Sequence, residues 1–417
     1  MSYYAIDFGT SNSLLNYISQ DGSITSIPLD PNSGKVLRSL LYTPEKNQWF
    51  FGSEAISEYV SREGEGRFLR SIKKFLPEPG YTGTSIHNKN LNISEMIAIF
   101  LGEMRKRANK ITGKNVEKLV LGRPALYSLD KAHDQLAQDR MQKASELAGF
   151  KDIIFCPEPI AAGLDYQSQG KDEKIVLITD FGGGTSDFTL MKFHNKGYSQ
   201  EDILGLSGIF MAGDVLDGVM MKDFISPHFG SQFEYQIPGG SNVLQFPRNL
   251  LKKICSPAHI THLREKDTWE FLQHINKFAL SHDDQRKMKN LFTLVECQLG
   301  FPLFNEIEKV KVELGSVSSS MFSYEFLDLM VQEEIKAEAY YQSVTPSIEE
   351  IINTMLEVFS QSGLKVSDVD QVCLTGGTSQ FPLIKEKLKE IFGKEKILEH
   401  NIYQSVVNGL SQFAIKL

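Results

Sequence analysis

The chain has 417 residues, of which 41% are hydrophobic and 23% are charged, and its formal net charge is −8. This composition is typical of a globular protein that is large enough for two to four domains or lobes. The acidic balance disfavours nucleic acid or an anionic membrane as the main partner, so we expect neither.

The 4 cysteines are far apart in the sequence and form no CxxC pair, which predicts reduced thiols in a reducing compartment. The first residues show no basic or apolar leader pattern, and no apolar run approaches the roughly 18 residues that a membrane span needs. We therefore expect a cytoplasmic protein without membrane contact.

The first motif follows directly on a short apolar strand, residues 4–6, and reads Asp7-Phe-Gly-Thr-Ser-Asn-Ser13. Farther on, residues 67–76 carry four basic side chains at a helix-like spacing before prolines end the run. A solvated basic face is the alternative interpretation of that run. A strand over 152–156 then leads into Pro157-Glu158-Pro159, which places a carboxylate at a strand-to-helix corner.

The central stretch, residues 174–190, predicts a β-hairpin with the glycine tip Asp180-Phe-Gly-Gly-Gly-Thr185. A glycine tip lets backbone N–H groups point at an anion, and the carboxylate of Asp180 could hold a cation that neutralises it. A plain tight turn is the alternative. Because Asp-Phe-Gly followed by hydroxyl residues occurs at two strand ends, we predict a duplicated β unit whose two turns face each other across a cleft.

The second half begins with a glycine turn that opens a helix within 203–217. Residues 226–315 have a different composition, which predicts an inserted, mainly helical subdomain with helices over 268–280 and 283–291. Four histidines in this region could be metal ligands, but without cysteines or an HExxH pattern we interpret them as scattered polar residues. Ser347 and Glu350 predict a capping box that starts a helix ending at Gly363. A strand–turn–helix unit over 371–392 and a short helix over 406–415 complete the chain.

Three common nucleotide-binding schemes are excluded by the sequence. No Gly-Lys pair lies in a P-loop, and no strand leads into a GxGxxG fingerprint. The two Asp-Phe-Gly triplets lack the VAIK and HRD motifs of a protein kinase.

The motifs resemble those of a known family. Ile6-Asp-Phe-Gly-Thr-Ser-Asn-Ser13, Asp180-Phe-Gly-Gly-Gly-Thr-Ser-Asp187 and Leu374-Thr-Gly-Gly-Thr-Ser-Gln-Phe-Pro382 are similar to the two phosphate loops and the adenosine loop of the actin-like ATPase superfamily. Glu158-Pro-Ile-Ala-Ala162 and Ile72-Lys-Lys-Phe-Leu76 resemble a connecting helix and a phosphate-reaching lysine of DnaK-type chaperones, the heat shock protein 70 family. Within that family, a branch limited to the ATPase domain (YegD-like) is most similar.

The resemblance implies an α/β actin-like ATPase fold with two ribonuclease H-like lobes. Lobe I would comprise residues 1–170, with 402–417 returning to it, and lobe II residues 171–401 with the inserted region. It implies ATP or ADP with Mg²⁺ as cofactor, K⁺ as a further candidate ion, and an unfolded or specific protein client or a co-chaperone as partner. No peptide-binding domain is expected.

The resemblance also assigns roles to residues. Asp7 and Asp180 would bind Mg²⁺, mostly through its waters. Lys73, Glu158, Thr185 and Asp187 would be catalytic, with Lys73 orienting the attacking water. The nucleotide would be bound by Gly9, Thr10, Ser11, Asn12, Gly182, Gly183, Gly184, Thr185, Gly213, Asp214, Glu308, Lys311, Gly376, Gly377, Thr378 and Gln380.

The sequence also departs from the family pattern. Gln380 stands where the chaperones have an arginine that stacks on adenine, Val312 replaces a basic residue, and Tyr403 replaces a carboxylate of the closing helix. Two alternatives to a slow ATPase switch stay open. One is a nucleotide sensor or scaffold that does not hydrolyse, which these departures favour, and the other is a small-molecule kinase of the same superfamily.

Overall fold

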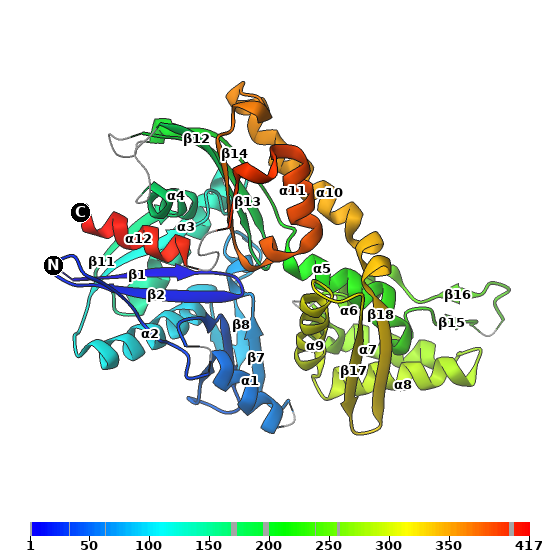
Figure 1. The fold of residues 1–417 in the computed structure, drawn as a ribbon. Coiled ribbons are helices and arrows are strands. Elements are labelled where there is room, and N and C mark those ends of the chain that lie inside the picture. Colours follow the sequence, from blue (N-terminus) through cyan, green and yellow to red (C-terminus); the bar gives the residue numbers. More distant parts are fainter. Residues whose placement is uncertain are drawn as a thin grey trace.

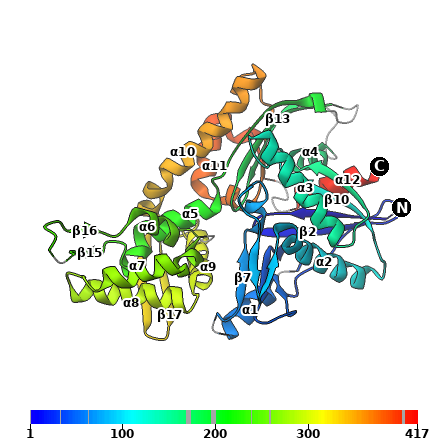
Figure 2. The same cartoon turned by 180° about the vertical axis from the view of Figure 1, so that it is seen from behind.

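The computed structural model describes residues 2–32, 34–62, 64–167, 173–194, 200–237, 239–256, 259–399 and 404–417. The expected lobe boundaries near residues 170 and 402, and Tyr403, lie outside these ranges. Within them, the chain forms two large sheets, with helices packed between and around them (Figures 1 and 2).

The first sheet has the strand order β11-β10-β1-β2-β3, with β4 paired to β2. Its strands are β1 (Tyr3–Phe8), β2 (Asn12–Ile18), β3 (Ile24–Ser26), β4 (Leu37–Arg38), β10 (Lys118–Arg123) and β11 (Asp152–Pro157). The second sheet has the order β14-β13-β12-β19-β20. Its strands are β12 (Lys174–Phe181), β13 (Ser186–Phe193), β14 (Ile203–Ile209), β19 (Gln371–Thr375) and β20 (Ile397–Leu398).

The two sheets repeat one arrangement. In each, an antiparallel hairpin (β1-β2 or β12-β13) is extended by a third antiparallel strand on one side. On the other side, two parallel strands follow the first strand of the hairpin. The predicted duplication of a β unit is therefore confirmed.

Helices α4 (Glu158–Gln167) and α12 (Ser405–Ile415) share a buried apolar cluster with both sheets. Side chains alternate between the faces of a strand, so one face of β1 gives Ala5 to this cluster, while Tyr4 and Ile6 enter a second cluster on the other face. That second cluster includes α2 (Ile93–Thr112) and α3 (Lys131–Leu147). Helix α12, which lies near the end of the chain, thus packs against the first sheet and α4.

The remaining elements of the first half form a small layer beside the first sheet. They are α1 (Gly52–Ser61), β5 (Leu40–Thr43), β6 (Phe50–Phe51), β7 (Arg67–Arg70), β8 (Thr84–Ile86) and β9 (Lys89–Leu91). A 3-10 turn, Ile72–Phe75, follows β7. The helix-like spacing expected for 67–76 is therefore wrong: a strand and a short turn carry these basic residues.

The region expected as an inserted subdomain lies to one side of the second sheet (Figure 1). It contains β15 (Glu234–Tyr235), β16 (Leu244–Gln245), α6 (Arg248–Ile254), α7 (Lys266–Asn276), α8 (His282–Glu296) and α9 (Gly300–Glu313). The hairpin of β17 (Ser319–Phe326) and β18 (Leu329–Lys336) follows it. The helices predicted over 268–280 and 283–291 correspond to α7 and α8.

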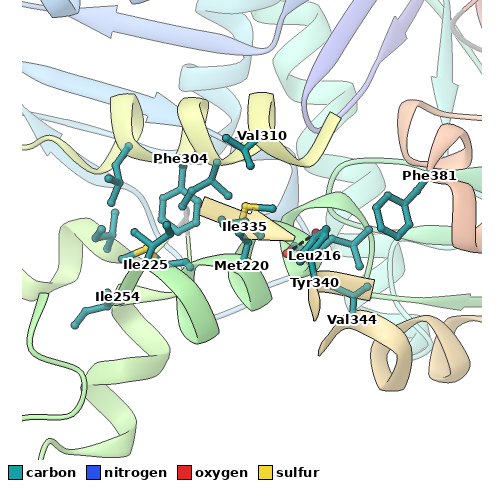
Figure 3. Packing of buried hydrophobic residues seen from close by; sticks show 14 of the residues in the cluster. Leu216, Met220, Ile225, Ile254, Phe304, Val310, Ile335, Tyr340, Val344 and Phe381 are labelled. Atoms are coloured by element: carbon teal, nitrogen blue, oxygen red, sulfur yellow. Dashed lines mark hydrogen bonds between the residues drawn. The ribbon is translucent and has the colours of Figure 1, made fainter. Parts of the chain in front are cut away.

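One large apolar core joins this region to the second sheet. Leu216 and Met220 of α5 (Gly213–Met220) pack among side chains of α9 and β18 (Figure 3). The hydroxyl of Tyr340, on α10 (Ala337–Ser362), donates to the carbonyl of Leu216 at 3.1 Å. Helix α11 (Pro382–Phe392) adds Ile384 and Leu388 to the same core. The position of α5 is consequently fixed from several sides.

The capping box predicted at Ser347 is wrong. Helix α10 begins ten residues earlier, directly after β18, and Pro346 lies inside it. The apolar stripe already starts at Tyr340 and Val344, and its burial against the core outweighs the backbone hydrogen bond that a proline removes. The predicted end is confirmed, because Gly363 caps the helix with a φ of 70°.

Candidate nucleotide and phosphate site

The two glycine turns have the same local geometry. The N–H of Gly9 donates to the carbonyl of Asn12 at 3.0 Å, and the N–H of Gly182 donates to the carbonyl of Thr185 at 2.9 Å. Each turn joins the two strands of its hairpin, β1-β2 or β12-β13. The duplicated sequence motif therefore encodes a duplicated backbone turn.

The two turns also face each other. A Cβ built on Gly183 would overlap the hydroxyl of Ser11. One built on Gly184 would overlap the side chain of Lys74 and would lie 3.3 Å from the Cγ2 of Thr10. The two turns therefore lie close together, with little room for a side chain at either glycine. The predicted cleft with one turn on each side is present.

Two further predicted segments pack on the second turn. The N–H of Asp214 donates to the carbonyl of Gly183 at 2.6 Å, and that of Gly213 donates to the carbonyl of Gly182 at 3.4 Å. The hydroxyl of Thr378 also donates to the carbonyl of Gly182, at 2.7 Å. Three glycine-containing segments that are distant in sequence thus meet at one point.

A cavity of about 230 Å³ lies at this meeting point. Most of the residues expected to contact a nucleotide line it: Thr10, Ser11, Asn12, Gly182, Gly183, Gly213, Asp214, Glu308, Lys311, Gly377, Thr378 and Gln380. Gly9, Gly184, Thr185 and Gly376 lie in the same turns but are not among the lining residues. Gly376 has a φ of 78°, and a Cβ there would overlap the carbonyl of Phe181, so this position requires glycine.

A buried ion pair lies behind the turns. The Nζ of Lys73 donates to Oε1 of Glu158 at 2.9 Å, and the two side chains are only 10% and 11% exposed. Burial lowers the pKa of Lys73, but the charges of Glu158 and Asp7 outweigh burial and raise it above its usual range. Lys73 therefore carries a fixed positive charge at this position.

Three aspartates share this environment. Burial raises the pKa of Asp7 to about 8, and repulsion from Glu158 and Asp180 adds to the shift. Burial and the charge of Glu158 raise the pKa of Asp180 to about 6. The pKa of Asp187 is raised to about 7 by burial and by Asp180, although a hydrogen bond from Thr185 opposes the shift. Four buried carboxyl groups thus surround the single ammonium of Lys73, and the raised pKa values show that they resist being ionised together without a further cation.

Such an excess of carboxylates fits a divalent cation. In the described part of the chain, no group of three or more His, Cys, Asp or Glu side chains is close enough to bind a metal directly. Mg²⁺ keeps most of its waters and commonly uses one or two carboxylates, so Asp7 and Asp180 are sufficient for it. When bound, the ion would supply positive charge that neutralises phosphate oxygens.

The aspartates give a prediction for the metal-free and nucleotide-free protein. Because Asp7 binds its proton more tightly when folded than when unfolded, its contribution to stability is present below pH 3.8 and is lost as the pH rises to about 8. We expect Asp7→Asn to raise the free energy of unfolding at pH 8 by roughly 2–4 kcal/mol and to change little at pH 4. Urea titrations in EDTA at both pH values measure this. Asp139→Asn, at an exposed helical site, is the control, and an equal effect of Asp7→Asn at both pH values would contradict the prediction.

Two ion pairs lie near the predicted base-binding end of the cleft. The Oδ1 of Asp217 lies 2.6 Å from the Nζ of Lys311, and Arg38 lies 3.6 Å from Glu308. Burial raises the pKa of Asp217 to about 6, with Lys311 opposing the shift. Glu308 and Lys311 both lie on α9, whereas Arg38 belongs to the first sheet, so this contact joins the two halves.

The sequence analysis missed several residues of the site, among them Lys74, Arg70 and Tyr127. Lys74 lies 2.5 Å from Asp214, a second contact across the cleft, and Arg70 lies 3.6 Å from the same carboxylate. The only signal for Lys74 was its place beside Lys73 in one motif. Tyr127 had no signal. Its buried hydroxyl makes no hydrogen bond to any residue that the structure describes, and its pKa is raised to about 12 by burial, while Lys73 lowers it and Glu158 raises it.

The fold and cleft define a protein of two halves with the same arrangement of strands, each with one glycine turn at a shared cavity. The family model described as "Hsp70 protein" matches residues 73–231 and 297–412, more than half of the chain. The chain belongs to the Hsp70 family, and its fold is the actin-like ATPase fold.

Curated relatives agree with this assignment. The chain is 24% identical over 417 residues to the protein named "Chaperone protein DnaK" of Thermosipho melanesiensis, covering 97% of this chain and 57% of that relative. It is 23% identical over 412 residues to the protein of the same name from Thermotoga petrophila, with the same coverage. The chain therefore spans little more than half the length of these relatives. Among the described helices, none has the length and apolarity needed to span a membrane.

Proposed function

We propose that this protein binds ATP or ADP with Mg²⁺ between two lobes, hydrolyses ATP slowly, and acts as a chaperone-like switch. The observation that carries the proposal is the buried Lys73–Glu158 pair, set among three aspartates where two matching glycine turns meet. Phosphoryl transfer needs positioning and charge stabilisation more than covalent chemistry, and these residues supply both.

Each group has a role in this proposal. The N–H groups of residues 10–12 and 183–185 bind the β- and γ-phosphates. Glu158 fixes the position of the Lys73 ammonium, which stabilises negative charge on the γ-phosphate and orients the attacking water. Thr185 and Asp187 hold that water and the cation's waters, and K⁺ is a further candidate ion. Gly376, Gly377, Thr378 and Gln380 contact the adenosine, with Glu308 and Lys311 opposite.

The lobes are proposed as residues 1–170 with 402–417, and 171–401 with the insertion of 226–315. Packing of α12 with α4 and the first sheet supports the return of the C-terminal segment. We also propose a cytoplasmic location, which fits four free cysteines. In this proposal the two lobes open and close around the nucleotide. A protein client or co-chaperone would bind the open and the closed arrangement with different affinities, because only such a difference couples its binding to that of the nucleotide.

The test is calorimetric titration of the protein with ATP and with ADP in Mg²⁺, followed by measurement of phosphate release over hours. We expect saturable binding of both nucleotides and slow phosphate release. Binding without release would replace the ATPase by a nucleotide sensor. The absence of binding to either nucleotide would contradict the proposal and would point to Gln380 and Val312, which both line the cavity.

A further inference from the structure

A second cavity, of about 500 Å³, lies beside the cleft. One wall comes from β7 and the 3-10 turn after it, and the other from the 3-10 turn Ile260–Arg264 with the end of α8 and the start of α9. The hydroxyl of Tyr59 donates to the carbonyl of Gln298, and the amide of Gln298 donates back to the carbonyl of Gly64 at 3.0 Å. These bonds hold the two walls together at one end of the cavity.

The walls are rich in aromatic and aliphatic side chains. Phe68 and Phe301 come from opposite walls, and their ring centroids are 4.3 Å apart. Phe75 and Tyr81 stack with centroids 4.5 Å apart, and Leu294 adds an aliphatic surface. Flat apolar groups bind well to such surfaces, because aromatic rings offer large contact areas.

The charged groups of the cavity are mainly cationic. Arg67, Arg70 and Arg264 line it, against one acid, Glu265, which already pairs with Lys253 at 3.2 Å. Within the described ranges, neither Arg67 nor Arg264 pairs with a carboxylate. Arg67 does donate to the hydroxyl of Thr84, at 3.0 Å. An arginine fork binds carboxylate, sulfonate or phosphate in a bidentate manner, so guanidinium groups without a carboxylate partner at an apolar cavity favour an anion with an apolar body.

Most of this cavity lies outside the segments that match the family. The match begins at residue 73 and is interrupted between 231 and 297. Arg67, Phe68 and Arg70 precede it, and Arg264 and Leu294 fall within the interruption. The cavity is therefore built chiefly by parts of this chain that the family model does not describe.

We propose that this cavity binds a small aromatic anion, with its ring packed against the aromatic side chains of the cavity and its acidic group on Arg67 and Arg264. The volume suits a small ligand of this kind. Arg70 and Phe301 line both this cavity and the cleft, so an occupant would touch groups that also border the proposed nucleotide site. The inference concerns a separate site and does not depend on ATP binding or hydrolysis.

The test uses 8-anilinonaphthalene-1-sulfonate, an aromatic sulfonate whose fluorescence rises in apolar surroundings, titrated into the full chain. We expect one saturable site, with affinity reduced about tenfold by Arg264→Ala and by Arg67→Ala. Both positions are exposed, so these variants should keep the fold, and circular dichroism checks this. Lys289→Ala is the control, because this lysine lies on α8, which also borders the cavity, but pairs at the surface with Asp328.

Three outcomes would overturn the proposal. These are the absence of saturable binding, an unchanged affinity in both arginine variants, and an equal loss in Lys289→Ala. The titration is repeated with saturating ATP and Mg²⁺. Competition by ATP, together with an unchanged affinity in the arginine variants, would place the probe in the cleft and would equally contradict the inference.

Discussion

Replacement of Lys73 by alanine is expected to reduce the rate of ATP hydrolysis by about 10²- to 10³-fold, with a change in nucleotide affinity of less than about tenfold. Lys73 is the cation at the centre of the buried carboxylates, with its Nζ 2.9 Å from Glu158. Its charge acts where negative charge accumulates during phosphoryl transfer. Most of the expected binding contacts are backbone groups of the glycine turns, which the substitution leaves in place. Single-turnover phosphate release and calorimetry measure the two quantities separately.

The neighbouring lysine provides the matched control. Lys74 pairs with Asp214 at the cleft, so Lys74→Ala should weaken contact between the lobes and alter nucleotide affinity more than the rate of the chemical step. Loss of a buried partner also destabilises Glu158, so the unfolding of each variant is followed alongside. If Lys74→Ala abolished hydrolysis and Lys73→Ala did not, the catalytic role would belong to Lys74.

The elements that local sequence determines were predictable. A hairpin with a glycine tip needs only alternating apolar residues and a turn that tolerates bare backbone, so the turns after Asp7 and Asp180 could be assigned from residues within a few positions. The duplication followed because both copies use the same short motif. The start of α10 was not predictable in this way, because Pro346 and Ser347 are typical of a helix start and only burial of Tyr340 and Val344 overrides them.

The candidate site also has a part that could be predicted and a part that could not. The positions of Lys73 and Glu158 came from resemblance to a family, since no periodicity relates two residues so distant in sequence. The contacts of Arg38 with Glu308 and of Lys74 with Asp214 join surfaces of different lobes. Such pairs depend on how the lobes meet, which a single sequence does not reveal. Tyr127 lies in a loop, where burial of a hydroxyl beside Lys73 leaves no pattern in the sequence.

Substitution of Gly409 by alanine is expected to lower the free energy of unfolding by roughly 2–3 kcal/mol, although alanine is normally the better helix former. Gly409 lies inside α12, and a Cβ there would overlap the carbonyl oxygen and carbon of Ala161 in α4. Both are backbone atoms of a fully buried residue, so the strain cannot be relieved by turning a side chain. The helices must move apart, and the apolar cluster between the two sheets must loosen with them.

Gly102→Ala is the matched control for this last prediction. Gly102 also lies inside a helix, α2, but the nearest atom to an added Cβ is 3.9 Å away, which is ordinary contact. With no overlap, only the gain in helix propensity remains, and the free energy of unfolding should rise by up to about 1 kcal/mol. Urea unfolding monitored by circular dichroism compares the two variants with the parent protein. If Gly409→Ala lowers the free energy of unfolding and Gly102→Ala raises it, the close contact of α12 with α4 is the cause of the loss. If Gly409→Ala instead stabilises the protein, the two helices are not in the contact described.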